Sequence, residues 1–106
     1  MISYEDFKKL EIRIATIDSA EKVENTDKLI KLTVDLGGQK RQLVAGIAEN
    51  HNCQDLIGKQ VPVLTNLEPK EIRGITSHGM ILAIESNGNA ILMHPEEKVA
   101  EGSIIR

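Results

Sequence analysis

The chain has 106 residues, a formal net charge of −3 and a hydrophobic content of 41%, which suits one domain over residues 1–106 with a single core and excludes two domains. It has no apolar run as long as a membrane span and no signal peptide at its start, so we expect a cytoplasmic protein without a membrane partner. A single cysteine, Cys53, excludes an internal disulfide. Cys53 and the nearby His51 form at most a fragment of a metal site, because no second pair of ligands follows at metal-site spacing.

The first third of the chain predicts a capped turn followed by two strands. Ser3 can cap a short helical turn that contains Asp6 and Phe7. Isoleucines at positions 12, 14 and 17 mark an extended segment. From Lys28 to Leu36, apolar residues at positions 30, 32, 34 and 36 alternate with polar ones at 31, 33 and 35. This pattern predicts a half-buried antiparallel strand with Lys31 and Thr33 on its outward face.

The middle of the chain predicts a hairpin, a short helix and a fourth strand. Gly37 and Gly38 form a turn into a strand over residues 40–45, so basic side chains of two paired strands should lie near one another. Asn52 can cap a short helix over residues 53–57. In the apolar run over residues 61–65, Pro62 indicates an edge strand or a bulge, because proline cannot donate a ladder hydrogen bond.

The polar connection over residues 66–79 is the most informative segment. It is too polar for the core, and a connection of this length in a small domain is usually functional or disordered. Its regular mix of proline, glycine and isoleucine favours order. Two cations, Lys70 and Arg73, and the polar side chains of Asn66, Ser77 and His78 suit a phosphate or ribose surface.

The last third predicts a hairpin with a turn over residues 86–89 between strands at 81–84 and 90–93, and an extended piece at 99–105. The order of elements predicts an all-β, five-stranded OB-fold barrel with a short helix between strands 3 and 4 and C-terminal strand additions. In that fold ligands lie on strands 2 and 3 and against the loops after strands 1 and 4. The lysine-bearing strands and the polar connection therefore occupy the expected ligand surface.

The charge distribution permits a basic face on this acidic chain. Residues 28–41 contain four basic side chains and one acidic one, whereas residues 11–27 contain two basic and five acidic ones. Ordinary solvated charges would give the same count. Tyr4 and Phe7 carry the only aromatic rings besides the histidines, so unpaired bases have no stacking platform. A nucleic-acid partner should therefore be a folded RNA that is read by its backbone and shape.

A series of short motifs runs through nearly the whole chain, and each motif alone is weak. They are Asp6-Phe7-Lys8-Lys9-Leu10-Glu11-Ile12-Arg13-Ile14, Asp27-Lys28-Leu29, Leu32-Thr33-Val34-Asp35-Leu36-Gly37, Gly46-Ile47-Ala48, Leu56-Ile57-Gly58-Lys59, Asn66-Leu67-Glu68-Pro69, Arg73-Gly74 and Ser77-His78-Gly79-Met80. Their order resembles the tRNA-binding domain family, which occurs free-standing in microbes and attached to methionyl-tRNA synthetase, there also as a separate β subunit. The chain departs from the family pattern at Val23-Glu24, where many members carry His-Pro, and at Thr26, where alanine is usual.

The resemblance implies a domain that binds tRNA by shape with little regard for sequence, commonly as a homodimer, alone or with the catalytic subunit of methionyl-tRNA synthetase. Positions 28, 66, 73, 77 and 80 match RNA-contacting or site-forming positions of the family. Together with the strand cations, the candidate tRNA-binding residues are Lys28, Lys31, Lys40, Arg41, Asn66, Lys70, Arg73, Ser77, His78 and Met80. We expect Arg73 to be the main contact, and the apolar pattern alone places the Met80 side chain in the core.

Two other functions remain open. The same barrel resembles a bacterial secretion chaperone that holds unfolded chains in apolar pockets of a dimer, although relatives of that chaperone lack the Ser-x-Gly-Met ending of residues 77–80. A domain that only joins subunits is the third alternative. The sequence has no nucleophile with an activating base, no phosphate-cradling glycine loop and no isolated carboxylate pair, so we expect a non-catalytic binding module without a cofactor or metal.

Overall fold

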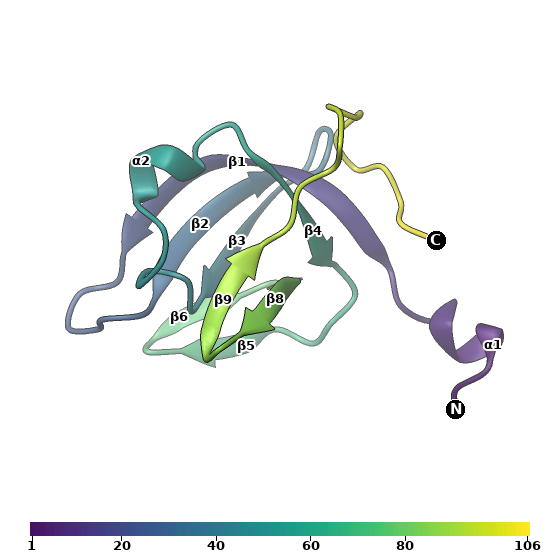
Figure 1. Ribbon diagram of the computed structural model, residues 1–106, viewed down its shortest axis with the longest axis horizontal. Coiled ribbons are helices and arrows are strands. Elements are labelled where there is room, and N and C mark those ends of the chain that lie inside the picture. The colour runs from purple at the N-terminus through teal and green to yellow at the C-terminus, as the bar shows by residue number, and fades with distance from the viewer.

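A five-stranded antiparallel sheet, curled into a nearly closed barrel, forms the centre of the computed structural model, which describes all 106 residues (Figure 1). The strands, in their order across the sheet, are β3 (Lys40–Ala45), β2 (Ile30–Asp35), β1 (Ile12–Lys22), β4 (Gln60–Leu64) and β7 (Met80–Ile81). The remaining elements are the helices α1 (Tyr4–Phe7) and α2 (Cys53–Leu56) and two hairpins, β5 (Lys70–Ile72) with β6 (Ile75–Ser77) and β8 (Ala83–Ser86) with β9 (Asn89–Leu92). The predicted all-β OB-fold, with its short helix between strands 3 and 4, is confirmed.

The core inside the barrel is aliphatic, as the scarcity of aromatic rings requires. The alternation predicted for β2 is confirmed, since Ile30, Leu32 and Val34 are fully buried while the residues between them are partly exposed. Leu56 of α2 is also fully buried and closes one end of the barrel. Backbone hydrogen bonds between Ile17 and the segment after α2 fix this helix on β1.

Strand β1 is long because it pairs with two other strands, β4 and β2. Its first half pairs with β4 and its second half with β2, and the register shifts between Ile17 and Ser19. Asp18 is therefore the extra residue of a β-bulge, which bends the strand and increases its twist. This bend lets one strand take part in both halves of the barrel.

The barrel closes where the β5–β6 hairpin docks on β3. The backbone N–H of Val44 donates to the hydroxyl of Ser77 at 3.0 Å, and the backbone N–H of His78 donates to the carbonyl of Gln42 at 2.9 Å. The Gln42 side-chain amide donates to the Thr76 carbonyl at 2.9 Å. The polar connection predicted over residues 66–79 is therefore ordered and contains a hairpin of its own.

The prediction that Pro62 marks an edge strand or a bulge is wrong, because the pairing of β4 with β1 runs without a register shift through Pro62. Strand β4 lies between β1 and β7, and all five of its residues are buried. The Pro62 carbonyl accepts a hydrogen bond from the Leu82 N–H on the β7 side, and the N and C=O groups of one strand residue face the same side. The proline nitrogen thus faces the place where the two-residue strand β7 has ended, so no ladder bond with β1 is lost.

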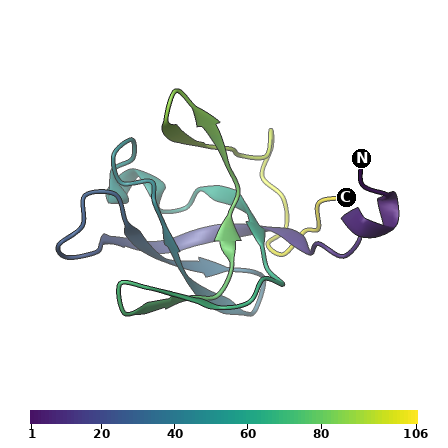
Figure 2. The same cartoon turned by 90° about the horizontal axis from the view of Figure 1, so that it is seen from below.

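The two ends of the chain lie together, away from the β1–β2 loop (Figures 1 and 2). Ser3 caps α1 in a capping box with Asp6, as expected, whereas the side chain of Asn52 makes no capping bond to α2. The predicted extended tail over residues 99–105 is confirmed only in part. Residues 101–102 form a turn, whereas Ile104 makes a bridge to Arg13 and residues 102–105 make backbone hydrogen bonds to Ile12 and Ile14 of β1. No helix has the length and apolar character needed to cross a membrane.

The approach of the tail to the β2–β3 turn requires glycine at position 102. Gly102 has φ +85°, and a Cβ there would overlap the Leu36 carbonyl oxygen. We expect Gly102→Ala to lower the free energy of unfolding by about 3 kcal/mol. The alanine would have a strained left-handed backbone, and its Cβ would overlap the Leu36 carbonyl oxygen. Gly38 has φ +89° but open space around it, so Gly38→Ala should cost only about 1 to 2 kcal/mol. Urea unfolding of both variants measures this difference, and equal losses would contradict the close approach.

Candidate nucleic-acid interface

The tip of the β5–β6 hairpin meets the β1–β2 loop at one end of the barrel (Figures 1 and 2). Arg73 and Gly74 form the two-residue turn, with φ of 54° and 79°, so the arginine lies at the tip and is exposed. Arg73 lines a hollow of about 330 Å³ with Lys28 and a second hollow of about 370 Å³ with Lys31. Three predicted cations from three segments thus come together at this end.

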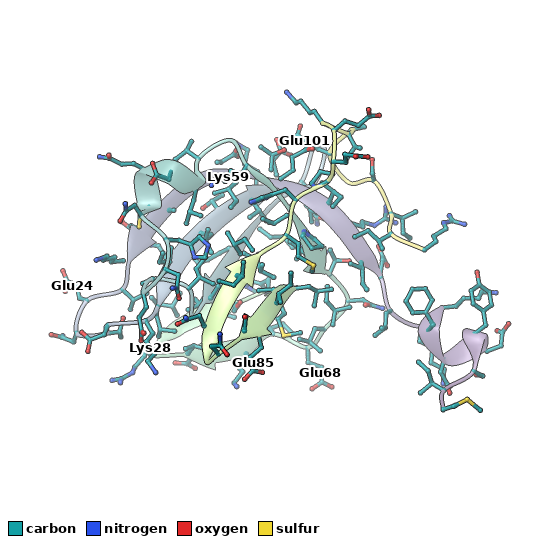
Figure 3. All side chains as sticks on the ribbon, in the orientation of Figure 1. Glu24, Lys28, Lys59, Glu68, Glu85 and Glu101 are labelled. Atoms are coloured by element: carbon teal, nitrogen blue, oxygen red, sulfur yellow. The ribbon has the colours of Figure 1, made fainter.

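Of the charged residues labelled in Figure 3, Glu24 and Lys28 lie at this end. Lys28 and Glu24 belong to the β1–β2 loop side of the molecule, whereas Lys59 lies by α2. Glu24 also lines the hollow that Arg73 shares with Lys31. The surface between the loop and the hairpin tip therefore mixes cations with at least one carboxylate.

A separate hollow of about 440 Å³ contains Lys40, Arg41 and His78. Lys40 and Arg41 are neighbours in β3, so their side chains leave opposite faces of the strand. Arg41 pairs in register with the buried Val34, and its guanidinium donates to the backbone carbonyls of Thr65 and His78. Arg41 therefore fixes the connection after β4 to β3. Five of the six predicted cations form two groups, Lys40 with Arg41 and Lys28 and Lys31 with Arg73, and Lys70 lies in neither group.

Two predicted polar contacts are engaged inside the protein. The Ser77 side chain is only 3% exposed, and its hydroxyl donates to the Gly79 carbonyl while it accepts from the Val44 N–H. The Asn66 side chain accepts from the Glu11 N–H at 2.8 Å and donates to the Lys9 carbonyl at 2.7 Å. Both side chains position the connection between β4 and β7, and Ser77 is too buried to offer its hydroxyl to a ligand.

Met80 and Lys70 line an apolar groove of about 290 Å³ beside the hairpin. The other lining residues include Val44, Ile47, Leu67, Ile72, Ile81 and Ala90. The Met80 side chain is 45% exposed, so its predicted place in the core is wrong. Strand β7 is an edge strand of only two residues, and no strand beyond it covers this side chain.

Carboxylates form ion pairs with three of the six predicted cations. Lys31 pairs with Glu21 at 2.6 Å, and Lys40 pairs with Asp18 at 2.8 Å. Lys28 pairs with Glu49 at a longer distance of 3.7 Å. The hydrogen bond and negative charge of Asp18 raise the pKa of Lys40 above its usual value, with smaller contributions from Asp35 and Glu101. Neither Lys70 nor Arg73 has an ion pair.

The predicted basic face on strands 2 and 3 is thus not net positive once β1 is added. Asp18, Glu21 and Asp35 oppose two lysines on the outward side of β1–β3. The sequence alone did not reveal this balance, because the acidic residues precede the basic ones and meet them only through strand pairing. It also missed Gln42, whose side chain holds the hairpin, although a position two residues after Lys40 in the predicted strand places Gln42 on the same face as Lys40. The structure brings no three His, Cys, Asp or Glu side chains together as a metal site.

Comparisons with known proteins agree with this architecture. The family described as "Putative tRNA binding domain" matches residues 12–104. A methionine–tRNA ligase of Archaeoglobus fulgidus is 51% identical over 102 residues, which are 96% of this chain and 16% of the ligase. The chain therefore spans about a sixth of the length of the curated relatives that it matches.

Two solved structures superpose over the whole chain. The MetRS related protein from Pyrococcus horikoshii has a TM-score of 0.94 and 34% identity, and the match covers 98% of that protein. The chaperone CsaA from Bacillus anthracis has a TM-score of 0.92 and 32% identity, with 99% of that protein covered. From the match over residues 12–104 and this agreement in fold, the chain belongs to the tRNA-binding domain family.

Proposed function

We propose that this chain binds tRNA by its folded shape, with little regard for sequence, and that it acts alone or as a subunit assisting methionyl-tRNA synthetase. The observation that carries the proposal is the place of Arg73 between Lys28 and Lys31. These cations come from a hairpin tip, a loop and a strand, so the fold fixes their spacing. Fixed cations suit the fixed phosphates of a folded RNA better than a flexible strand.

The chemistry of the individual groups supports a backbone contact. Arg73 has no ion pair, and its planar guanidinium can hold a phosphate through two parallel hydrogen bonds. Tyr4 and Phe7 lie in α1 at the other end of the molecule, so no aromatic ring is near Arg73 to stack an unpaired base. The net charge of −3 weakens attraction to other polyanions.

The candidate residues divide into contacts and supports. We assign phosphate or ribose contact to the exposed or partly exposed side chains of Lys28, Lys31, Lys40, Lys70, Arg73 and His78. Arg41, Asn66 and Ser77 support these contacts by fixing the connection that carries the hairpin. Met80 shapes the adjoining groove.

A homodimer is part of the same proposal. The β8–β9 hairpin exposes Ile84 and Ile91, and Leu67 and Met80 are exposed beside the apolar groove. An isolated two-stranded hairpin is marginally stable in water. A second copy of the chain packed on β8–β9 would cover these side chains and stabilise the hairpin.

The second candidate function is that of a chaperone for unfolded chains. It is favoured by the apolar groove of about 290 Å³ and by the structural similarity to the chaperone CsaA from Bacillus anthracis. Suppression of the aggregation of a test protein, together with no measurable binding of tRNA, would reverse our ranking. Binding of tRNA without such suppression would support the first function.

The role of Arg73 is tested by substitution. We expect Arg73→Ala to weaken tRNA binding by about thirtyfold, equivalent to roughly 2 kcal/mol, because a charge-assisted bidentate contact is lost. The slope of the logarithm of the binding constant against the logarithm of the salt concentration should decrease in magnitude by about one unit. Arg73→Lys should restore only part of the affinity, because an ammonium group cannot form the bidentate contact. Filter binding at several salt concentrations measures all three effects.

Lys59→Ala is the matched control, because Lys59 is an exposed cation by α2 with no ion pair. Its loss should change tRNA affinity by less than about twofold, in line with a distant screened charge. Lys28→Ala should weaken binding in the same direction as Arg73→Ala. Unchanged affinity in both Arg73→Ala and Lys28→Ala would refute the site, and equal affinity of the wild type for unfolded RNA would refute shape recognition.

The dimer is tested by light scattering coupled to gel filtration. We expect the wild type to have twice the 11.7 kDa chain mass. The double variant Ile84→Asp/Ile91→Asp should be monomeric, because it would bury two carboxylates in the seam. Its circular dichroism should stay that of a folded barrel, since both side chains are exposed in the single chain. A monomeric wild type, or a double variant that remains dimeric, would contradict this seam.

A further inference from the structure

Lys22 is an exposed cation at the end of β1, and it has no ion pair. It lines the hollow of about 370 Å³ that Arg73 shares with Lys31. Lys31 is paired with Glu21 at 2.6 Å, whereas Arg73, like Lys22, has no carboxylate at ion-pair distance. Lys22 is therefore an unpaired cation in the same hollow as the proposed main contact.

The strand register explains why Lys22 stays unpaired. Lys22 forms the last pair of the β1–β2 ladder with Ile30, which is fully buried. Opposite residues of an antiparallel pair share a face, so Lys22 begins on the core side of the sheet, at the end of the ladder. Glu21 and Lys31 form the pair before it and share the outward face. The carboxylate that neutralises Lys31 is thus directed to the opposite face from Lys22.

Lys22 decides the net charge of this hollow. The charged residues that line it are the cations Lys22, Lys31 and Arg73 and the carboxylates Glu21 and Glu24. Without Lys22, the two carboxylates would balance the two remaining cations, and the lining would have no net charge. With Lys22 the lining is net positive, which favours an anionic group over water in a concave surface.

We propose that Lys22 is a further tRNA-contacting residue, which binds a backbone phosphate next to the one that Arg73 binds. This inference rests on the proposed binding of tRNA and adds a residue to that site. A phosphate that reaches Lys22 displaces no carboxylate, unlike a phosphate that reaches Lys31. The two unpaired cations also complement each other, because the guanidinium of Arg73 has a fixed planar fork, whereas the ammonium of Lys22 is a point charge on a flexible stem.

The test is the substitution Lys22→Ala, measured by filter binding of tRNA at several salt concentrations. We expect affinity to fall about tenfold, which is less than for Arg73→Ala because an ammonium group makes no bidentate contact. The slope of the logarithm of the binding constant against the logarithm of the salt concentration should decrease in magnitude by about one unit. Lys22→Arg should keep the affinity within about twofold, because it keeps the charge and the donors. Circular dichroism checks that both variants are folded.

Two controls separate a contact from a general effect of charge. Lys22→Ala/Glu24→Gln has the net charge of the wild type and the same net charge in the hollow. It should remain at least about fivefold weaker than the wild type, because removing an exposed carboxylate contributes only a few tenths of a kcal/mol. Full recovery of affinity would overturn the contact. Lys59→Ala should again change affinity by less than about twofold.

Chemical modification of the wild type gives a second measurement that needs no substitution. Saturating tRNA should slow the reaction of Lys22 with an amine-selective acylating reagent several-fold and leave that of Lys59 unchanged, as read by mass spectrometry of peptides. Equal reactivity of Lys22 with and without bound tRNA would overturn this inference alone. So would a loss of affinity in Arg73→Ala with none in Lys22→Ala. A wild type that fails to bind tRNA would overturn the proposed function and this inference with it.

Discussion

The candidate site depends on the docking of the β5–β6 hairpin on β3. Each strand of this hairpin has only three residues, and a hairpin of that size has no stability of its own in water. The Ser77 hydroxyl accepts from the Val44 N–H in a buried position, and leaving that N–H without a partner would cost about 1 to 3 kcal/mol. The chain thus places a strong structural constraint a few residues from Arg73, and this constraint fixes the arginine relative to the β1–β2 loop.

The same docking explains why the polar residues of the connection divide into two kinds. Those near the base of the hairpin, Ser77 and Asn66, bond to the protein backbone, whereas Arg73 at the tip bonds to nothing. Supports that already bond to the backbone need no reordering when a ligand binds, and Arg73 has no carboxylate to release. The arrangement is therefore organised for a rigid anionic partner before that partner arrives.

The parts of the structure that follow from local pattern could be predicted from the sequence. Strict alternation in β2, the Gly37–Gly38 turn, and the Asn87–Gly88 turn each encode their geometry within a few residues, so these elements and the OB-fold order were predicted correctly. Properties set by contacts between distant segments could not be read in this way. Met80 looked like a core residue because its strand is apolar, yet β7 ends before anything covers it. The carboxylates that neutralise Lys31 and Lys40 come from β1, and only the strand register and the bulge bring them there.

The fold itself does not separate the two candidate functions. A MetRS related protein and a chaperone both superpose on this chain with TM-scores above 0.9, so the barrel serves either role and the decision lies in its surfaces. Here the cations around Arg73 lie between the β1–β2 loop and the hairpin tip, while the apolar groove lies between the hairpin, β3 and the start of β8. The two surfaces share the hairpin but have different lining at its tip and at its base. An anionic partner at the tip and an apolar partner at the base would therefore not compete through the docking of the hairpin on β3, because both require the docked hairpin.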